Sequence, residues 1–334
     1  MLQNDSNRLA LFGFIVAVLA IAALVLMNEP ARSENRTLPR LAGQAERDRP
    51  ATRPDSPSDL PAEPDVEGRS PATRPATQPT TLPDSPRPDG LVPPGRRDSL
   101  ARRVAIAHHE NLWPRDKVLR TEFALEFDGL GEMAGTMFYD LHRDLVRMEL
   151  TAPEECTLVW DGEKAWVAPS EAELPRARFH LRTWSYFLAA PFKLNDPGTS
   201  LEEQEVRRML DRGWETARLT FQPEVGDAPD DWYLLYVDPV RYTLKAMAYI
   251  VTYGKSTDAQ LADAEADPHA IVYEDYALIH GLLISPSWTF YNWSDDRNIH
   301  GDPIGTVELS GLNFVEPRDG LFAQPADARE DPRP

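Results

Sequence analysis

The sequence predicts a mainly β (α+β) fold, in which a strongly curved antiparallel sheet forms an unclosed half-barrel with helices over its concave side. Three observations support this prediction. An Asp161-Gly162 pair lies between two short runs of β-branched and aromatic residues, which is typical of a tight hairpin. Many further alternating runs follow along the chain, and one helical stretch separates two series of them. This order favours a single large antiparallel sheet that curves around a helix.

The large apolar residues are confined to the later part of the chain. All 8 tryptophans of the 334 residues lie between Trp113 and Trp293, whereas residues 28–112 contain no Phe, Trp or Tyr. Residues 30–94 also hold 15 of the 31 prolines. Such a segment cannot offset the cost of ordering its backbone, about 1–2 kcal/mol per residue. We therefore predict a Pro-rich disordered linker at 28–98, a folded domain at 99–325, and tails at 1–8 and 326–334, the second of them disordered.

An apolar run near the N-terminus predicts a membrane anchor. The run from Leu9 to Met27 has 19 residues without a charge, close to the length of about 20 that spans a bilayer as a helix. A cleaved signal peptide is the alternative, but its apolar core is usually about 7–15 residues long and ends at a better small-x-small site than Ala31-Arg32-Ser33. We predict an uncleaved transmembrane helix at residues 9–27. Arginines flank the run on both sides, so the charge rule does not decide its orientation.

The charge of the predicted domain restricts its partners. Residues 101–316 carry 20 Lys and Arg against 37 Asp and Glu, which accounts for nearly all of the net charge of −19. A surface this acidic repels phosphate backbones, so we expect no nucleic-acid partner. The single cysteine, Cys156, allows no intrachain disulfide. We expect it to be a small buried side chain on a strand.

Hydrophobic periodicity predicts the elements of the domain. A short helix is expected at 99–112 with Ser99 as its cap. Helical spacing recurs at 179–190 and 201–210, with Pro191 interrupting it. Strands are expected at residues 118–128, 135–141, 145–150, 156–160, 164–167, 215–221, 232–237, 243–253, 270–276, 282–293 and 306–314.

No motif predicts catalysis or a metal centre. His108 and His109 are adjacent on the predicted helix and would point about 100° apart, unlike the i, i+4 pair that converges on zinc. Four aspartates between residues 227 and 238 lack the spacing of a calcium loop, and a solvated turn explains them better. A nucleophile motif and a Gly-rich phosphate loop are also missing. We therefore expect neither an enzyme nor a cofactor nor a metal.

One block of the sequence resembles a known family. Residues 135 to 169 contain, in order, Gly135, Arg143, Arg147, Pro153, Asp161, Gly162, Trp166 and Pro169, and the chain closes with Leu321, Phe322 and Pro325. This series resembles the bacterial outer-membrane lipoprotein carriers, the family of LolA, LolB and their relatives. The resemblance implies an unclosed barrel with a helical lid, a lipid or acylated protein as ligand, and a domain outside the inner membrane.

The resemblance also assigns a role to Arg143. In the carrier family the matching arginine holds the lid closed by hydrogen bonds to the lid backbone, so Arg143 is the predicted lid contact. Asp144 stands where the family usually has proline, and the spacing from Gly135 is longer than in the family. An ion pair of Arg143 with Asp140 or Asp144 is the alternative.

The predicted strands supply apolar side chains for the concave face. An open curved sheet does not always fill this face with its own helices, and a groove of Met and aromatic side chains suits acyl chains, since each buried methylene contributes about 0.8 kcal/mol. The alternative is that these side chains form an ordinary core. The candidate ligand-binding residues are Phe123, Phe127, Met137, Tyr139, Met148, Trp166, Tyr233, Leu235, Met247 and Tyr249.

Taken together, the residues and the resemblance predict a non-catalytic binding protein for a lipid or the acyl group of a lipoprotein. Residues 9–27 would hold it at the inner membrane, with the domain in the periplasm. An envelope interaction or sensing module of the same fold is the main alternative. An enzyme acting on an envelope polymer is a weaker one, because no paired acids or catalytic triad are evident.

Overall fold

The computed structural model describes residues 98–128 and 131–334. Its helices are α2 (Leu100–Ala107), the 3-10 turn η2 (Glu110–Leu112), α3 (Ala177–Lys193) and α4 (Asp258–Glu265). Its strands are β1 (Val118–Phe127), β2 (Gly131–Asp140), β3 (Leu145–Ala152), β4 (Cys156–Trp160), β5 (Ala165–Ala168), β6 (Thr199–Met209), β7 (Arg212–Phe221), β8 (Tyr233–Val237), β9 (Leu244–Tyr249), β10 (His269–Glu274), β11 (Ala277–Ile279), β12 (Leu282–Ile284), β13 (Ser287–Ser294), β14 (Asn298–Val315) and β15 (Arg329–Asp331).

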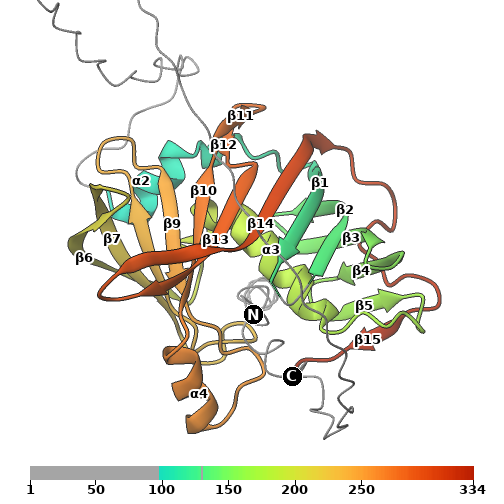
Figure 1. Cartoon of the computed structure of the whole chain (residues 1–334). Coiled ribbons are helices and arrows are strands. Elements are labelled where there is room, and N and C mark those ends of the chain that lie inside the picture. The colour runs from blue at the N-terminus through green and yellow to red at the C-terminus, as the bar shows by residue number, and fades with distance from the viewer. Residues whose placement is uncertain (1–97, 129–130) are drawn as a thin grey trace, which may run out of the picture. The chain divides into compact units, whose positions relative to one another are not determined.

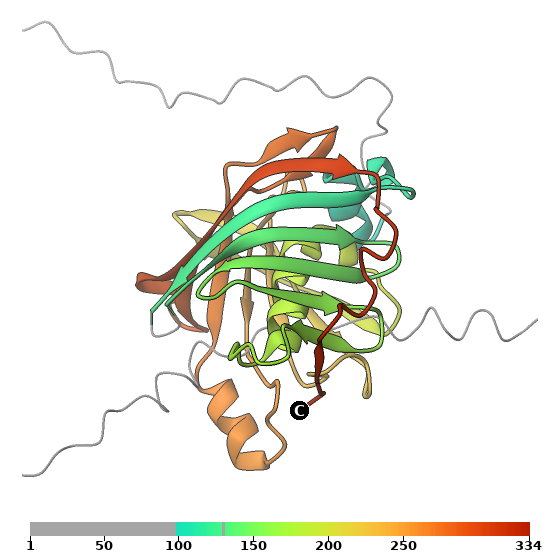
Figure 2. The ribbon, with the colours of Figure 1, turned by 90° about the vertical axis from the view of Figure 1, so that its right-hand side faces the viewer.

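Thirteen of these strands form one antiparallel sheet (Figure 1). The strand order is β15-β5-β4-β3-β2-β1-β14-β13-β10-β9-β8-β7-β6, so most neighbours are also consecutive along the chain. The two edge strands, β15 and β6, do not pair with each other, which leaves the sheet unclosed. Figure 2 shows how strongly the strands curve. The prediction of a mainly β fold with a large, unclosed antiparallel sheet and few helices is confirmed.

The hairpin around Asp161 and Gly162 forms as predicted. β4 pairs with β5 from Thr157 and Ala168 to Trp160 and Ala165. Asp161 Oδ1 accepts hydrogen bonds from the backbone N–H groups of residues 163 and 164 at 2.9 and 2.8 Å. Gly162 has a φ of 101°, which few other residues adopt without strain. The turn is therefore fixed by local chemistry, as the sequence indicated.

A glycine allows the close approach of β2 and β3. The pairing register shifts between Ala134 and Gly135. A Cβ atom on Gly135 would lie 2.3 Å from the carbonyl oxygen of Glu149 and 2.8 Å from Cα of Leu150. Both are backbone atoms, so they cannot move aside as a flexible side chain could. The first residue of the family-like block is thus required by the packing of two strands.

α3 fills the concave side of the sheet (Figure 1). All 17 of its residues are buried, and it contacts β3, β4 and β5 as well as α2. Phe187 is in contact with aromatic rings of β9 and β13, with ring centroids 5.5 Å from Tyr249 and 5.6 Å from Phe290. The main hydrophobic core therefore lies between α3 and the sheet. A second core containing Trp214, Trp232 and Trp293 packs separately.

Pro191 lies inside α3 and does not end it, contrary to the prediction from the sequence. A proline lacks the N–H group that would bond to the carbonyl four residues earlier, here that of Phe187. The hydroxyl group of Tyr273, on β10, donates a hydrogen bond to this same carbonyl oxygen at 3.0 Å. The sheet thus supplies the bond that the helix lacks, and α3 continues to Lys193.

The hydrogen bond from Tyr273 to the Phe187 carbonyl gives a testable prediction. Tyr273→Phe should lower the free energy of unfolding by about 1–3 kcal/mol, because the Phe187 carbonyl is then buried without a partner. In a Pro191→Ala background the alanine N–H can donate a hydrogen bond to that carbonyl. Tyr273→Phe should therefore lower the free energy of unfolding by less in this background. Chemical denaturation of the four proteins of this double-mutant cycle measures the difference. Additive losses would show that the two groups do not act on the same carbonyl.

Several predicted elements are corrected by the structure. Residues 201–210 were expected to be helical, but they belong mainly to β6, because pairing with β7 from Thr199 to Met209 outweighs the helix propensity of their Glu, Gln and Arg residues. The tail at 326–334 was expected to be disordered, but β15 pairs with β5. The run at 282–293 divides into β12 and β13 at Pro286. α4, with a capping box at Thr257 and Gln260, was not predicted.

The predicted anchor at residues 9–27 lies outside the described residues, as does the predicted linker apart from Asp98. Among the residues that are described, none of the helices is both long and apolar enough to cross a membrane.

Candidate ligand site on the concave face

Nine of the ten predicted ligand-binding residues lie together in the core between the sheet and α3. Their contacts with α3 are direct: Phe127 packs against Trp184 with ring centroids 5.6 Å apart, and Tyr233 packs against Tyr186 at 5.2 Å. All nine are buried to at least 96%. The helix therefore occupies the position that the sequence analysis assigned to a ligand. The nine residues are Phe123, Phe127, Met137, Tyr139, Met148, Tyr233, Leu235, Met247 and Tyr249.

Trp166 is not part of this group. Side chains alternate along β5, and Ala165 and Val167 are its fully buried residues. Trp166 lies on the opposite face of β5. There its Nε1 donates a hydrogen bond to Asp161 Oδ2 at 2.7 Å, and the Lys164 ammonium lies 5.5 Å from its ring. Its role is to support the hairpin turn, and we remove it from the candidate site.

Among the residues that the structure describes, three tyrosine hydroxyl groups in this core find no hydrogen-bond partner. They belong to Tyr139, Tyr233 and Tyr249. Burial raises the pKa of each of them well above its ordinary value, so all three remain protonated. A buried hydroxyl without a partner is costly, by about 1–3 kcal/mol in protein mutational data. The face under α3 thus offers polar groups that the helix does not satisfy.

An ion pair holds the N-terminal part of α3. The guanidinium of Arg178 binds the Asp227 carboxylate through both Nε and Nη2, the latter bond being 2.8 Å long. The side chains are 11% and 3% exposed, so the pair is shielded from water. Arg178 also stacks on Trp160, with 4.6 Å between the guanidinium carbon and the ring centroid. The backbone N–H of Arg178 donates to Oδ2 of Asp331, the last residue of β15.

A second group of ion pairs holds α3 farther along its length. Arg182 Nη1 lies 2.5 Å from Asp144 Oδ2, and Lys193 Nζ lies 3.6 Å from Asp144 Oδ1. Asp144 is in the turn between β2 and β3 and has a φ of 54°. Arg182 stacks on the same ring as Arg178, that of Trp160, with 4.6 Å between its guanidinium carbon and the ring centroid. We refer to Arg178–Asp227 and Arg182–Asp144 as the two α3 ion pairs.

Arg143, the predicted lid contact, does not hold α3 in this structure. Its side chain is 58% exposed, and its Nε binds Asp140 Oδ2 at 2.5 Å within the β2–β3 turn. This ion pair is the alternative that the sequence left open. Asp144, which stands where proline was expected, contacts the helix instead. The turn therefore contacts the helix through an acid that binds two basic side chains of the helix, and not through an arginine that binds the helix backbone.

The pairing of Arg178 with Asp227 and of Arg182 with Asp144 was not predicted from the sequence. A signal was available on α3, because Arg178 and Arg182 are spaced i, i+4 and so lie on one side of a helix that is otherwise apolar. Two arginines on a helix that must be buried require buried carboxylates. Their identity depended on the fold, since Asp227 lies 49 residues from Arg178.

Most of the histidines and aspartates considered as metal ligands have structural partners. His108 Nε2 accepts from the backbone N–H of Leu244 at 3.1 Å, and its Nδ1 lies 2.9 Å from the carbonyl oxygen of Leu283. Asp231 Oδ1 accepts two hydrogen bonds from Thr252. Within the described ranges no three His, Cys, Asp or Glu residues gather in a way that could hold a metal ion. Burial raises the pKa of the Cys156 thiol to about 11, so this cysteine is unreactive near neutral pH.

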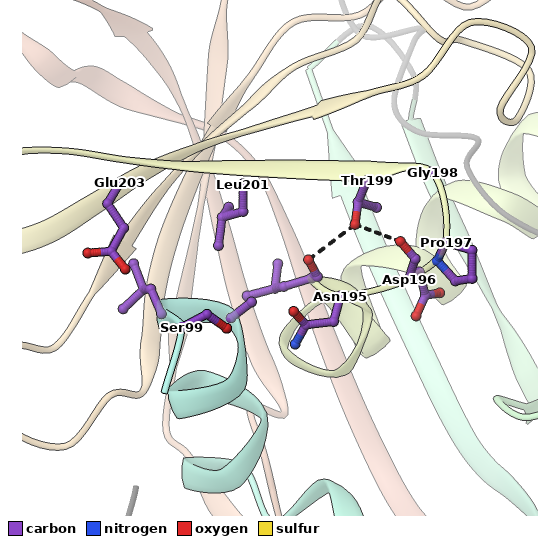
Figure 3. Close-up of a pocket in the computed structure, with 11 residues that line it drawn as sticks. Ser99, Asn195, Asp196, Pro197, Gly198, Thr199, Leu201 and Glu203 are labelled. Carbon is purple, nitrogen blue, oxygen red and sulfur yellow. Dashed lines mark hydrogen bonds between the residues drawn. The ribbon is translucent and has the colours of Figure 1, made fainter. Parts of the chain in front are cut away.

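A surface pocket of about 350 Å³ lies near the start of α2 and the loop after α3 (Figure 3). Thr199 Oγ1 donates to the carbonyl oxygens of Leu194 and Asp196, which fixes this loop. Burial raises the pKa of the Asp196 carboxyl group. None of the predicted ligand-binding residues lines the pocket, so we do not assign the ligand to it. Its lining residues are Ser99, Leu100, Ala101, Leu194, Asn195, Asp196, Pro197, Gly198, Thr199, Leu201 and Glu203.

Three solved structures are similar in fold. A LolA superfamily protein from Nitrosomonas europaea shares 10% identity, with a TM-score of 0.44 over 68% of this chain and 99% of that one. A DUF1329 family protein from Desulfovibrio piger also shares 10% identity, with a TM-score of 0.41 over 67% and 94% of the two chains. A domain described as an outer membrane lipoprotein-sorting protein, from Vibrio parahaemolyticus, shares 10% identity, with a TM-score of 0.34 over 66% and 94%.

In fold, the chain is similar to a LolA superfamily protein and to a lipoprotein-sorting domain, which is the kind of similarity that the resemblance of residues 135–169 led us to expect. The chain belongs to DUF6503, a family of unknown function, whose family model matches residues 132–302. No curated protein matches the chain.

Proposed function

We propose that the domain is a non-catalytic binding protein for a lipid or for the acyl group of a lipoprotein. The single observation that carries this proposal is the way α3 fills the concave face. One helix covers an apolar surface of Met, Leu and aromatic side chains, and two ion pairs that involve only a few residues tie it to the rest of the fold. In this proposal the structure is the closed state, and a ligand takes the place of α3.

The composition of the face under α3 suits such an exchange. Met137, Met148 and Met247 are unbranched and adapt to chains of different shape. An acyl chain restores the apolar contacts that α3 would lose, at about 0.8 kcal/mol for each methylene buried. The unpartnered hydroxyl groups of Tyr139 and Tyr233 offer hydrogen bonds to an ester or carboxylate. Such polar groups would orient a ligand that is otherwise held by apolar contact.

The buried charges of α3 fit a helix that moves. A buried ion pair adds little to stability compared with apolar residues of similar size, because both charges lose their water. Arg178 and Arg182 regain that water when α3 leaves the groove, so the helix can be exposed without uncovering a purely apolar surface. The anchor predicted at residues 9–27 remains part of the proposal, because it would keep the domain near a source of lipid.

Hydrogen exchange tests this proposal directly. Addition of a saturating fluorescent fatty acid should speed the exchange of α3 amides and leave β8 amides unchanged, because only α3 has to move. Native mass spectrometry of the purified full chain should also reveal bound lipid. Binding of the probe with unchanged protection of α3 would locate the ligand elsewhere. A chain that carries no lipid and does not bind the probe would end the proposal.

A further inference from the structure

Three of the most exposed apolar side chains lie at one corner of the sheet. Among the described residues, four large apolar side chains are well exposed: Val206 at 67%, Leu210 at 58%, Val240 at 81% and Leu278 at 43%. Val206 is on β6, Leu210 is in the turn between β6 and β7, and Val240 is in the turn between β8 and β9. We call these three residues the apolar corner.

The two turns of the apolar corner are neighbours in space. β7 pairs with β8, and Glu215 faces Val237 near the ends of these strands. Arg212, next to Leu210, forms an ion pair with Asp238, next to the turn that carries Val240. The strands β6, β7 and β9 lie on one side of the sheet in Figure 1. Leu278, on β11, belongs to the separate two-stranded sheet.

The hairpin tip displays Leu210 in a strained conformation. Leu210 and Asp211 have φ angles of 50° and 64°, a region that glycine and asparagine adopt at lower cost than leucine. Trp214 holds the tip in place, because its Nε1 donates to the Met209 carbonyl oxygen at 2.7 Å and the Arg212 guanidinium stacks 3.8 Å from its ring centroid. The leucine is therefore presented by a rigid turn, and its exposure does not result from fraying.

Arginines surround the apolar corner although the domain is strongly acidic. Arg207 is paired with Asp295 at 2.6 Å, and Arg212 is paired with Asp238. Arg208 donates a hydrogen bond to the backbone carbonyl of Asp211, 3.4 Å away, and within the described part of the chain neither it nor Arg241 forms an ion pair. Two exposed guanidinium groups thus remain available at the tips of the turns, beside the exposed apolar side chains.

We propose that the apolar corner contacts the surface of a lipid bilayer, with Leu210 and Val240 among the acyl chains and with Arg208 and Arg241 on lipid phosphates. Apolar side chains flanked by basic ones are the composition that binds at the interface of a membrane. A protein partner fits less well, because a stable interface buries about 800 Å² on each side and two turn tips offer far less. The proposal does not depend on a ligand under α3.

Spin labels on the full chain test the proposal. The native Cys156 is 6% exposed and has a pKa of about 11, so it should not react with a thiol label near neutral pH. Leu210→Cys, Val240→Cys and Leu278→Cys variants each receive one nitroxide and are mixed with vesicles of phosphatidylcholine and phosphatidylglycerol. Labels at 210 and 240 should collide less with a water-soluble nickel complex and more with oxygen than in the absence of vesicles. The label at 278 should not change.

Two further variants separate the apolar contribution from the charge. Leu210→Asn suits the left-handed turn, so it should keep the fold while weakening the membrane contact of a label at 240 by about tenfold. Arg208→Gln together with Arg241→Gln should remove any preference for phosphatidylglycerol. Water-exposed labels at both positions in the presence of vesicles would overturn the proposal. Dipolar coupling between labels on two chains, without membrane depth, would also overturn it and indicate a contact between copies.

Discussion

Replacing Asp227 with asparagine should lower the free energy of unfolding by about 3–5 kcal/mol, because it leaves the Arg178 guanidinium buried without its counter-charge. The carboxylate is 3% exposed and binds Arg178 through both oxygens. For a domain of this size such a loss corresponds to a fall in melting temperature of about 10 °C. Thermal unfolding followed by circular dichroism measures it. A fall of only about 2 °C would mean that water reaches the pair.

The same variant tests the proposed movement of α3. If the ligand binds only when α3 has left the groove, weakening the Arg178–Asp227 pair raises the fraction of binding-competent protein and should tighten the apparent affinity for a fluorescent fatty acid. Glu330→Gln is a matched control, since it breaks the exposed Lys164–Glu330 pair at the edge of the same sheet. It should change neither stability nor affinity appreciably. If Asp227→Asn lowers the stability but does not tighten the binding of the fatty acid, the Arg178–Asp227 pair has only a structural role.

Elements set by local chemistry could be predicted from the sequence. The Asp161-Gly162 turn needs only an Asx carboxylate and a glycine, and β1 shows its alternation in the sequence because one face of the strand is buried. The cap at Ser99 also appears where it was expected, accepting from the backbone N–H of Arg102. For the same reason nine of the ten candidate residues could be assigned to one face of the sheet.

Elements set by distant partners could not be predicted. Residues 199–209 have a helix-forming composition, and only the adjacent β7 makes them a strand. Pro191 should end a helix, and only the hydroxyl of Tyr273 on β10 allows it to continue. Trp166 was assigned to the groove on its residue type, although its neighbours Ala165 and Val167 occupy the inner positions. The partners of the two α3 ion pairs could not be predicted either, because they are far apart in the sequence and only the fold brings them together.

Acidification should destabilise the domain through two buried histidines. Burial lowers the pKa of His108 and of His180 from 6.5 to about 4. Both are neutral acceptors in the fold: His108 Nε2 accepts from the Leu244 N–H, and His180 Nδ1 accepts from Trp184 Nε1 at 3.3 Å. Between pH 6.5 and pH 4 the unfolded chain gains protons that the folded chain does not bind. Stability therefore falls as the pH decreases through this window, by up to about 3 kcal/mol for each histidine.

Single substitutions isolate this effect from the other titrating groups. His108→Gln keeps an acceptor for the Leu244 N–H but cannot be protonated, so the stability advantage of the wild type over this variant should shrink by about 3 kcal/mol from pH 7 to pH 4. Asp231→Asn is a control of opposite sign. Burial raises the pKa of the Asp231 carboxyl well above its ordinary value, so just above that ordinary value the unfolded chain ionises this carboxyl and the folded chain does not. The wild type should therefore improve relative to this variant on acidification. Urea denaturation at several pH values measures both differences, and a constant difference between the wild type and His108→Gln would show that His108 is accessible to protons in the folded domain.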